Sequence, residues 1–467
     1  MPGSPSLARI VSPVDGSIYA ERAEATASMI TDAVDAARRA QQAWSRVPVL
    51  ERGEICTAAV VEMNAMADDI SIELAWQMGR PVRYGPGELR GFTERANHMI
   101  AIAEDALAPV NIAEKPGFDR FIERDPLGLV FVVAPWNYPF LTAVNSVIPA
   151  LMAGNAVLLK HATQTLLVGE RFQMAFDRAG LPEGLFRNLV LSHSATASLL
   201  GAGSVDQVNF TGSVAAGRDI ERSAAGTFTG VGLELGGKDP AYVRADADLA
   251  HAIENVVDGA FFNSGQSCCG IERVYVHRSV YDDFVDRAVA LTEQYVLGNP
   301  LDHATTLGPM VRARAADDVR AQIAQAVAAG GRQVVNLERF ELDRPGSPYM
   351  APQILVNVDH SMDLMVHENF GPVVGIMPVD SDEEAVALMN DSPYGLTASV
   401  WTADVDAARS LGRQIETGTV FMNRADYLDP ALAWTGVKDT GRGVTLSALG
   451  YGNLTRPKSF HLRHTLG

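Results

Sequence analysis

Two of the three cysteines of this chain, Cys268 and Cys269, are adjacent in the stretch "FFNSGQSCCGIERV". In a polar segment that contains glycine, such a pair could form a strained disulfide, contribute half of a metal site, or present one reactive thiol beside a bystander. Three cysteines cannot all pair, and a secreted disulfide framework uses a larger, even number. The ten histidines are scattered, and the closest pair, His461 and His464, lies in the tail. We therefore expect no metal site, which leaves a reactive thiol or an inert one.

Two further segments contain residues suited to chemistry. In "GVGLELGGKDP", Glu234 stands among glycines and apolar residues, where partial burial would raise its pKa and suit it to general base catalysis. A solvated loop carboxylate is the alternative. In "FTGSVAAG", Gly212 and Ser213 follow a predicted strand and precede a helix that carries Gly217, so backbone N–H groups could bind a phosphate. This is not the usual G-x-G-x-x-G pattern, and an ordinary strand-to-helix turn stays open.

Composition limits the classes of function. A chain of 467 residues is long enough for two or three domains, and 47% hydrophobic with 20% charged residues is typical of a globular protein. The formal net charge of −18 disfavours binding to nucleic acid or to anionic membranes. Apolar runs such as "GLVFVVAPW" are shorter than the ~20 residues that span a bilayer, and "MPGSPSLARIV" lacks a basic region followed by a hydrophobic one. We expect a cytoplasmic protein.

The hydrophobic pattern predicts an α/β fold. A helix is expected at 28–45, within a helical region that continues to about residue 104. The stretch 117–139 reads as two short strands broken at Asp125-Pro126, and beyond it predicted strands and helices alternate with short turns. These are strands at 154–160, 185–192 and 205–213 and a helix at 164–180 closed by Gly180. Such alternation predicts a mostly parallel sheet with helices on both faces and a ligand site at the carboxyl ends of its strands.

Seven motifs, in order and spacing, resemble those of the aldehyde dehydrogenase superfamily: "APWNYP", "LLKHATQT", "FTGSVAAG", "LELGGKDP", "FFNSGQSCC", "HENFGPV" and "VKDTGRG". The resemblance covers nearly the whole chain. It implies a Rossmann-type cofactor domain, an α/β catalytic domain and a small β oligomerisation element, and hence a homodimer or homotetramer. The expected boundaries are 1–113 with 128–235 for the cofactor domain, 236–440 for the catalytic domain, and 114–127 with 441–467 for the oligomerisation element.

The resemblance also implies the catalytic residues. Cys268 matches the family nucleophile, two positions after Gln266, and Cys269 becomes the bystander. The side-chain amide of Asn137 and the backbone N–H of Cys268 would stabilise the oxyanion. Glu234 matches the base that activates water against the thioester. Relatives that transfer the acyl group to coenzyme A usually lack that glutamate, so a hydrolytic enzyme that oxidises an aldehyde to the acid is expected.

A nicotinamide cofactor, NADP or NAD, is implied as well. Relatives that prefer NAD carry a glutamate three residues after the lysine at the adenosine ribose, and this chain has Thr163 at that position. The neutral hydroxyl removes a repulsion against a 2′-phosphate, while Lys160, with possible help from His161, adds positive charge. We expect NADP to be accepted at least comparably to NAD. The cofactor residues implied by the resemblance are Trp136, Lys160, Thr163, Gly212, Ser213, Gly217, Glu368 and Phe370.

For the substrate tunnel, the resemblance implies Tyr138, Asn145, Phe262, Tyr427 and Trp434. On composition alone, aromatic residues at such spacings are more often simple core. Asn145 and Ser146 stand where many family members have a large aromatic residue and a lysine, which predicts a wider and more polar tunnel. Asp426 would favour a cationic substrate and Arg424 an anionic one, but the aromatic residues favour a neutral aromatic or aliphatic aldehyde. A catalytically silent relative is the alternative, and the joint presence of Asn137, Glu234 and Cys268 argues against it.

Overall fold

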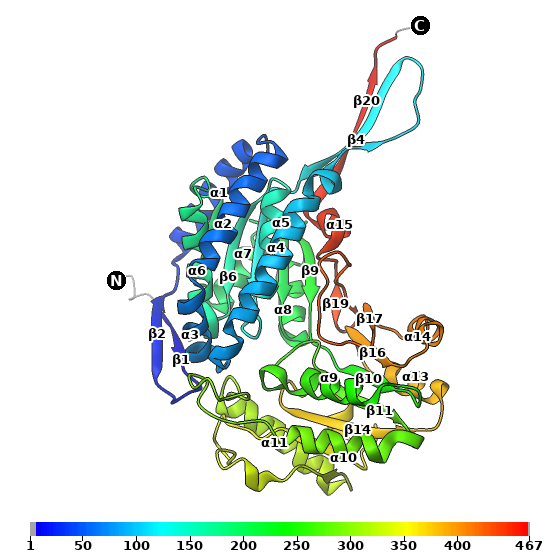
Figure 1. The fold of residues 1–467 in the computed structure, drawn as a ribbon. Coiled ribbons are helices and arrows are strands. Elements are labelled where there is room, and N and C mark those ends of the chain that lie inside the picture. The colour runs from blue at the N-terminus through cyan, green and yellow to red at the C-terminus, as the bar shows by residue number, and fades with distance from the viewer. Residues whose placement is uncertain (1–5, 466–467) are drawn as a thin grey trace.

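The structure, a computed structural model, describes residues 6–465. Two sheets with their helices form the body, and a long arm projects from it (Figure 1). The strands are β1 (Leu7–Val11), β2 (Ile18–Ala23), β3 (Val110–Asn111), β4 (Phe118–Pro126), β5 (Leu129–Ala134), β6 (Ala156–His161), β7 (Phe186–Asn188), β8 (Gln207–Thr211), β9 (Gly230–Glu234), β10 (Asp239–Val243), β11 (Ile271–His277), β12 (Arg332–Gln333), β13 (Gln353–Val356), β14 (Val373–Val379), β15 (Tyr394–Gly395), β16 (Thr397–Trp401), β17 (Thr419–Met422), β18 (Val437–Lys438), β19 (Gly441–Arg442) and β20 (Thr455–Arg463).

The α-helices surround these sheets. They are α1 (Ala27–Trp44), α2 (Val49–Asn64), α3 (Ala67–Met78), α4 (Gly85–Leu107), α5 (Pro139–Met152), α6 (Leu166–Arg178), α7 (His193–Gly201), α8 (Val214–Ala224), α9 (Leu249–Phe261), α10 (Tyr281–Thr292), α11 (Ala313–Ala328), α12 (Asp363–Val366), α13 (Asp382–Asn390), α14 (Val405–Gly412) and α15 (Ser447–Gly450).

The first sheet has the order β19-β9-β8-β5-β6-β7, and its neighbours are parallel except for the short β19. Every residue of β5 ("LVFVVA") and β6 ("AVLLKH") is buried, as expected for parallel strands that are covered on both faces. Helices α1, α5 and α6 contact β6, and α2 and α4 pack on α5. The mostly parallel α/β fold predicted from the sequence is confirmed.

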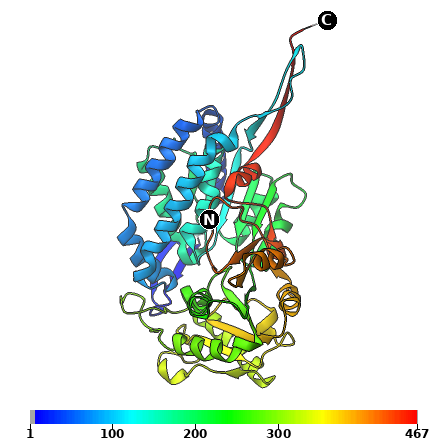
Figure 2. The same ribbon diagram turned by 45° about the vertical axis from the view of Figure 1, so that its right-hand side comes forward.

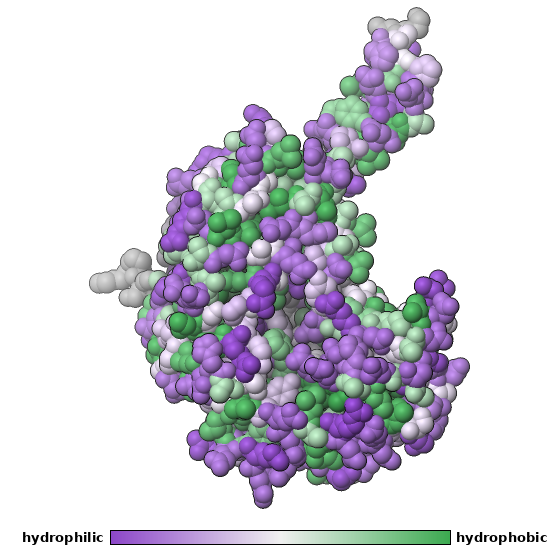
Figure 3. Space-filling model, in the orientation of Figure 1, coloured by the Kyte–Doolittle hydropathy of each residue, from purple (hydrophilic) through white to green (hydrophobic). Residues whose placement is uncertain are grey.

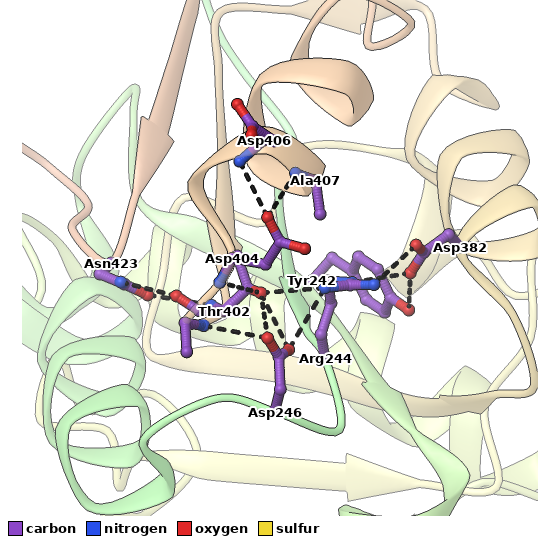
Figure 4. A network of polar contacts seen from close by, with 10 residues as sticks. Tyr242, Arg244, Asp246, Asp382, Thr402, Asp404, Asp406, Ala407 and Asn423 are labelled. Carbon is purple, nitrogen blue, oxygen red and sulfur yellow. Dashed lines mark hydrogen bonds and ion pairs between the residues drawn. The ribbon is translucent and has the colours of Figure 1, made fainter.

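The second sheet has the order β12-β13-β14-β11-β10-β16-β17 and lies in the lower half of the molecule, which Figure 2 shows in the turned view. A polar network ties its strands to the following helices (Figure 4). Arg244, just after β10, donates to Asp382 in the first turn of α13 and to Thr402 after β16, and the Thr402 hydroxyl bonds Asp246. The Tyr242 hydroxyl also donates to Asp382, at 2.8 Å. These bonds hold the ends of β10 and β16 together.

The arm consists of β3, β4 and β20, in the order β20-β4-β3. β20 pairs with β4 over nine residues, from Thr455 opposite Pro126 to Arg463 opposite Phe118. The arm stands clear of the body and carries hydrophilic and hydrophobic side chains together (Figure 3). One face has a stacked pair, Phe121 on Phe460, with ring centroids 4.7 Å apart. Within this chain the arm therefore leaves much side-chain surface uncovered.

Local expectations agree with the structure in most places. The helix predicted at 28–45 is α1, and the two strands predicted at 117–139 are β4 and β5, with the break at residues 127–128, just after the predicted Asp125-Pro126. Gly180 follows α6 with φ +76°, a left-handed conformation that suits glycine. The strand predicted at 185–192 is only three residues long; Leu189 N–H still donates to the Leu159 carbonyl of β6 at 2.8 Å, and the chain then leads into the Ser192 cap of α7.

Candidate active site

The predicted site residues gather where the parallel strands of the first sheet end. Asn137 follows β5, Lys160 is near the end of β6, Gly212 follows β8, and Glu234 ends β9. Parallel strands present their carboxyl ends at one edge of the sheet, so residues up to 97 positions apart share that edge. Cys268, from the second half of the chain, faces the same region and lines a cavity together with Glu234.

This cavity has a volume of about 220 Å³, which is large enough to hold a small molecule. Side chains from both halves of the chain line it. They are Arg80, Tyr84, Glu88, Arg95, Tyr138, Leu141, Thr142, Asn145, Thr211, Glu234, Leu235, Phe262, Cys268, Cys269, Leu396, Asp426, Leu428 and Trp434, with Gly87.

The two adjacent cysteines have different environments. Both are free thiols; Cys268 is partly buried and Cys269 is buried. The Cys269 thiol donates to Asp426 Oδ1 at 2.8 Å. Its hydrogen bond with Cys268, together with burial, raises the pKa of Cys269 well above the usual thiol value. Cys269 is thus held as a protonated thiol, which leaves Cys268, the less buried of the two, as the candidate nucleophile. Within the described residues, no group of His, Cys, Asp and Glu side chains could hold a metal ion.

Asn137 is 5% exposed and is not one of the residues that line the cavity; a buried network sets its position. Its Nδ2 donates to the Gln266 carbonyl at 3.1 Å, two residues before Cys268, which leaves its second amide hydrogen for another acceptor. The Asn137 carbonyl accepts from Arg80 Nη2 and from Asn263 Nδ2. Arg80 in turn pairs with Glu88, and both side chains are almost fully buried. These hydrogen bonds and the Arg80–Glu88 ion pair therefore fix the backbone between β5 and α5.

Glu234 is oriented by two hydroxyl groups. Thr211 Oγ1 donates to Glu234 Oε2 at 3.1 Å, and Thr445 Oγ1 donates to Oε1 at 2.5 Å. Burial is the main cause that raises the pKa of Glu234 above the usual carboxyl range. A carboxylate with a raised pKa is a better proton acceptor for water, as the sequence reasoning expected for a general base.

Glycines let the chain pass closely behind the cysteine. A Cβ on Gly237 would lie 2.2 Å from the Cys268 carbonyl oxygen, and a Cβ on Gly236 would lie 2.4 Å from the Glu368 carboxylate. Gly237 N–H also donates to Glu368 Oε1 at 3.0 Å. Close approach to backbone therefore requires glycine at Gly237, whereas a side chain at Gly236 would displace the Glu368 carboxylate.

The predicted adenosine side of a cofactor site lies at the end of β6. Lys160 is buried, which lowers its pKa, and its only hydrogen bond among the described residues is a long one, 3.4 Å to the His161 carbonyl. Such an ammonium group has donors left for ligand hydroxyls, and Thr163 is exposed beside it. His161 does not supply the positive charge suggested by the sequence, because burial lowers its pKa to about 3 and its ring bonds Thr165 and the Pro139 carbonyl.

The turn after β8 has the form of an anion site. Ser213 caps α8, with its hydroxyl accepting from Ala216 N–H at 3.3 Å, and it is exposed next to Gly212. Gly217 is buried, and a Cβ there would lie 2.5 Å from the Leu235 side chain, so a larger residue would force Leu235 to move. The free N–H groups of the first turn of α8 can bind a pyrophosphate.

The predicted nicotinamide side is formed by Trp136, Glu368 and Phe370. The Trp136 and Phe370 rings meet edge to face, with centroids 5.6 Å apart. Burial, with the nearby Glu272 charge, raises the pKa of Glu368 to about 8. Phe370 has a left-handed φ of +49°, and its N–H donates to Glu272 at 2.9 Å. Glu272 is itself paired with the buried Lys238 at 2.7 Å, which supports this strained loop.

Four of the five predicted tunnel residues line the cavity: Tyr138, Asn145, Phe262 and Trp434. Tyr427 is not one of the lining residues. Its hydroxyl bonds Glu94, and its ring lies 3.6 Å from the Arg424 guanidinium, while the neighbouring Asp426 and Leu428 face the cavity.

Sequence reasoning missed the charged residues that come from before β5. Arg80, Glu88 and Arg95 all line the cavity, and each is at most 8% exposed. In the sequence, "GELRGFTER" resembles the solvated face of an ordinary surface helix. Thr445 was missed too, since it acts only through its bond to Glu234.

Known proteins resemble this chain in sequence over most of its length. The chain matches a sequence model described as the aldehyde dehydrogenase family over residues 2–460. It is 32% identical to lactaldehyde dehydrogenase of Escherichia coli (strain K12), over 90% of this chain and 87% of that protein. It is 33% identical to 3,6-anhydro-alpha-L-galactose dehydrogenase of Streptomyces coelicolor, over 98% and 93%.

Solved structures show the same fold. Gox0499 superposes with a TM-score of 0.93 at 32% identity, covering 97% of this chain and 99% of the other. PnpE in complex with nicotinamide adenine dinucleotide superposes with a TM-score of 0.94 at 27% identity, covering 99% and 95%.

Proposed function

Because this chain belongs to the aldehyde dehydrogenase family, and therefore oxidises an aldehyde to a carboxylic acid with NAD or NADP, we propose which of its residues perform each step. The observation that carries the assignment is the meeting of Cys268 and Glu234 at one cavity, with the Asn137 amide directed at the backbone just before Cys268. These three groups supply a nucleophile, a base and an oxyanion donor. A silent scaffold would need none of them.

Cys268 attacks the aldehyde carbonyl carbon as a thiolate and forms a thiohemiacetal. The oxygen that becomes negative is stabilised by the backbone N–H of Cys268 and by the second amide hydrogen of Asn137. An aldehyde holds its hydrogen too firmly for direct hydride loss, whereas the tetrahedral adduct can expel it. Loss of one such oxyanion donor typically costs about 10²- to 10³-fold in kcat.

The residues present fit a nicotinamide dinucleotide. Lys160 has ammonium donors left over, α8 offers a capped N-terminus beside Gly212, and the Trp136 and Phe370 rings meet edge to face. We propose Lys160 and Thr163 for the adenosine ribose, Gly212, Ser213 and Gly217 for the pyrophosphate turn, and Glu368 with Phe370 for the nicotinamide end. The bound cofactor supplies the acceptor for the hydride.

Glu234 then completes the reaction. Oxidation leaves the acyl group on Cys268 as a thioester, and Glu234 removes a proton from the water that attacks it. Thr211 and Thr445 fix the direction of the carboxylate, and burial keeps its pKa high enough for proton transfer. Cleavage of the C–S bond releases the acid and Cys268 as the thiolate, and return of the Glu234 proton to solvent restores the starting state.

We propose that NADP is used at least comparably to NAD. Thr163 has no charge to repel a 2′-phosphate, and Lys160 lies nearby on β6. Relatives of both kinds are known, including a probable succinate-semialdehyde dehydrogenase [NADP(+)] of Synechocystis that is 33% identical. The buried, neutral His161 adds nothing to this preference.

We also propose the domain division and a homodimer or homotetramer. The first sheet and its helices, within 1–113 and 128–235, would form the cofactor domain, and the second sheet, within 236–440, the catalytic domain. The arm of β3, β4 and β20 supports an oligomerisation element, because its uncovered edges and faces suit a partner subunit. β19 pairs with β9, so the chain returns to the first sheet before it enters the arm.

A cytoplasmic location is proposed on the three free thiols, which suit a reducing compartment. Among the described residues, no helix has the length and apolar character needed to cross a membrane.

The experiment that tests the function is a panel of aldehydes incubated with NAD or NADP, with reduced nicotinamide followed by its absorbance. The expected result is stoichiometric formation of the carboxylic acid and of reduced cofactor, abolished in Cys268→Ala. Oxidation that persists in Cys268→Ala would overturn the assignment of the nucleophile.

A further inference from the structure

The cavity beside Cys268 has polar groups that are buried and have no partner among the described residues. Asn145 is 2% exposed, and its Nδ2 donates to nothing within residues 6–465; the same holds for the buried Tyr138 hydroxyl. Both side chains line the cavity that contains Cys268. Buried polar groups without partners are costly and rare, so they point to a ligand that supplies the missing hydrogen bonds.

Arg95 on α4 is the strongest donor in this wall. It is 8% exposed, and its Nη1 donates to the Leu141 carbonyl at 2.6 Å and, at the long distance of 3.4 Å, to Asn145 Oδ1. Within the described part of the chain, its Nε and Nη2 have no acceptor, and no carboxylate lies within ion-pair distance. The guanidinium thus keeps two N–H donor groups for a ligand.

Asp426 provides the complementary acceptor. Its Oδ1 accepts from the Cys269 thiol at 2.8 Å and from the Ser267 hydroxyl at 3.5 Å. Its Oδ2 has no donor among residues 6–465. Asp426 has a left-handed backbone conformation, φ +49°, and its side chain lines the cavity, whereas the next residue, Tyr427, does not line it.

The charges around the cavity decide among ligand classes. Its wall carries two guanidinium groups, Arg80 and Arg95, and three carboxyl groups, Glu88, Glu234 and Asp426. A carboxylate on the substrate would add a negative charge to a wall where carboxyl groups already outnumber guanidinium groups. An ammonium group would face Arg95. A hydroxyl group needs no counter-charge, because it accepts from a guanidinium or amide and donates to a carboxylate at the same time.

We propose that the substrate is a small hydroxyaldehyde, whose hydroxyl group accepts from Arg95 or Asn145 Nδ2 and donates to Asp426. This inference rests on the proposed function and names the substrate class of the same site. It narrows the expectation of a neutral aromatic or aliphatic aldehyde to one that carries a hydroxyl group, since a purely apolar chain would leave these buried groups unpaired. Sites built to bond a substrate hydroxyl reject analogues without it, here by an expected factor of at least about 100 in kcat/KM.

The test compares lactaldehyde with propionaldehyde, which differ only in the hydroxyl group. The wild-type protein is expected to prefer lactaldehyde by at least about 100-fold in kcat/KM, and Arg95→Met is expected to reduce that ratio to below about 10-fold. Arg90→Met, an exposed arginine on the same helix, is the matched control for charge and should keep the wild-type ratio. A wild-type ratio near one, or the same ratio in Arg95→Met as in Arg90→Met, would overturn the proposal.

A second variant and a binding assay separate this inference from the proposed function. If Arg95→Met does not fold, Asn145→Leu, of nearly the same shape, should also lower the lactaldehyde ratio. Calorimetry with Cys268→Ala compares the binding of the two aldehydes without turnover; tighter binding of lactaldehyde supports the subsite, and equal affinities refute it. If Cys268→Ala binds lactaldehyde more tightly than propionaldehyde but the wild-type protein oxidises neither, the proposed function is wrong and the hydroxyl subsite is still supported.

Discussion

Breaking the buried ion pair between Arg80 and Glu88 should damage both stability and catalysis. The two side chains are 2% and 0% exposed. Arg80 also donates to Asn263 Oδ1 at 3.2 Å and to the Asn137 carbonyl. In Arg80→Met, the Glu88 carboxylate stays buried without its counter-charge, and loss of one partner of such a pair typically costs about 3–5 kcal/mol. The carbonyl of Asn137 loses one of its two donors as well.

The second carboxylate oxygen of Glu88 makes the experiment more discriminating. Glu88 Oε1 accepts the N–H groups of Phe140 and Leu141, at 2.9 and 3.1 Å, at the start of α5. Glu88→Gln keeps an oxygen for these two donors and removes the charge. The double variant, Arg80→Met with Glu88→Gln, should therefore recover about 2 kcal/mol of what Arg80→Met loses, because the unpaired charge is gone.

Urea denaturation followed by tryptophan fluorescence measures the stability of each variant, and steady-state kinetics measures kcat. Arg80→Met is expected to lower kcat by about 10- to 100-fold, because Asn137 loses the hydrogen bond from Arg80 that helps to position its amide. The double variant should regain more stability than activity. Arg409→Met, which breaks the exposed pair with Asp406, is the control and should change little. An Arg80→Met protein that loses less than about 1 kcal/mol and keeps its kcat would refute the reasoning.

The remaining predictions concern chemistry, cofactor and assembly. Cys268→Ser should abolish oxidation, while Cys269→Ser, whose hydroxyl can still donate to the same carboxylate, should keep most of it; equal losses in the kinetic assay would contradict the assignment. Glu234→Gln should keep a first-turnover burst of reduced cofactor but slow the steady state by about 10²- to 10⁴-fold. Because burial raises the pKa of Glu234, deacylation in the wild-type protein should fall as pH drops through a value above the usual carboxyl range, and a Gln variant with the same pH profile would exclude this base. Thr163→Glu should impair kcat/KM for NADP by a larger factor than for NAD, and strict NAD dependence of the wild-type protein would show that Thr163 does not set the preference. Deletion of residues 454–467 removes β20 and should lower the oligomeric state or the solubility, as sedimentation would show.

Much of the catalytic assignment could be made from the sequence because the relevant residues lie in short segments with strong local constraints. The segments "LELGGKDP" and "FTGSVAAG" contain glycines with close neighbours, Gly237 against the Cys268 carbonyl and Gly217 against the Leu235 side chain, so the candidate base and phosphate turn are marked along the chain itself. Likewise, the continuous apolar runs of β5 and β6 report a sheet buried on both faces, and the residues that follow them must lie at its carboxyl edge.

Only the tertiary structure decided the polarity of the cavity. Arg80, Glu88 and Arg95 precede β5, and nothing in their local pattern distinguishes them from solvated residues. Glu88 and Arg95 are buried on α4, which packs on α5, and Arg80, between α3 and α4, is buried in its ion pair with Glu88. Only the structure shows that Asp426 contacts the Cys269 thiol and lines the cavity, whereas its neighbour Tyr427 does not line it. Sequence spacing records which groups are near along the chain, whereas burial, pairing and charge balance depend on long-range packing, and these determine what the site can bind.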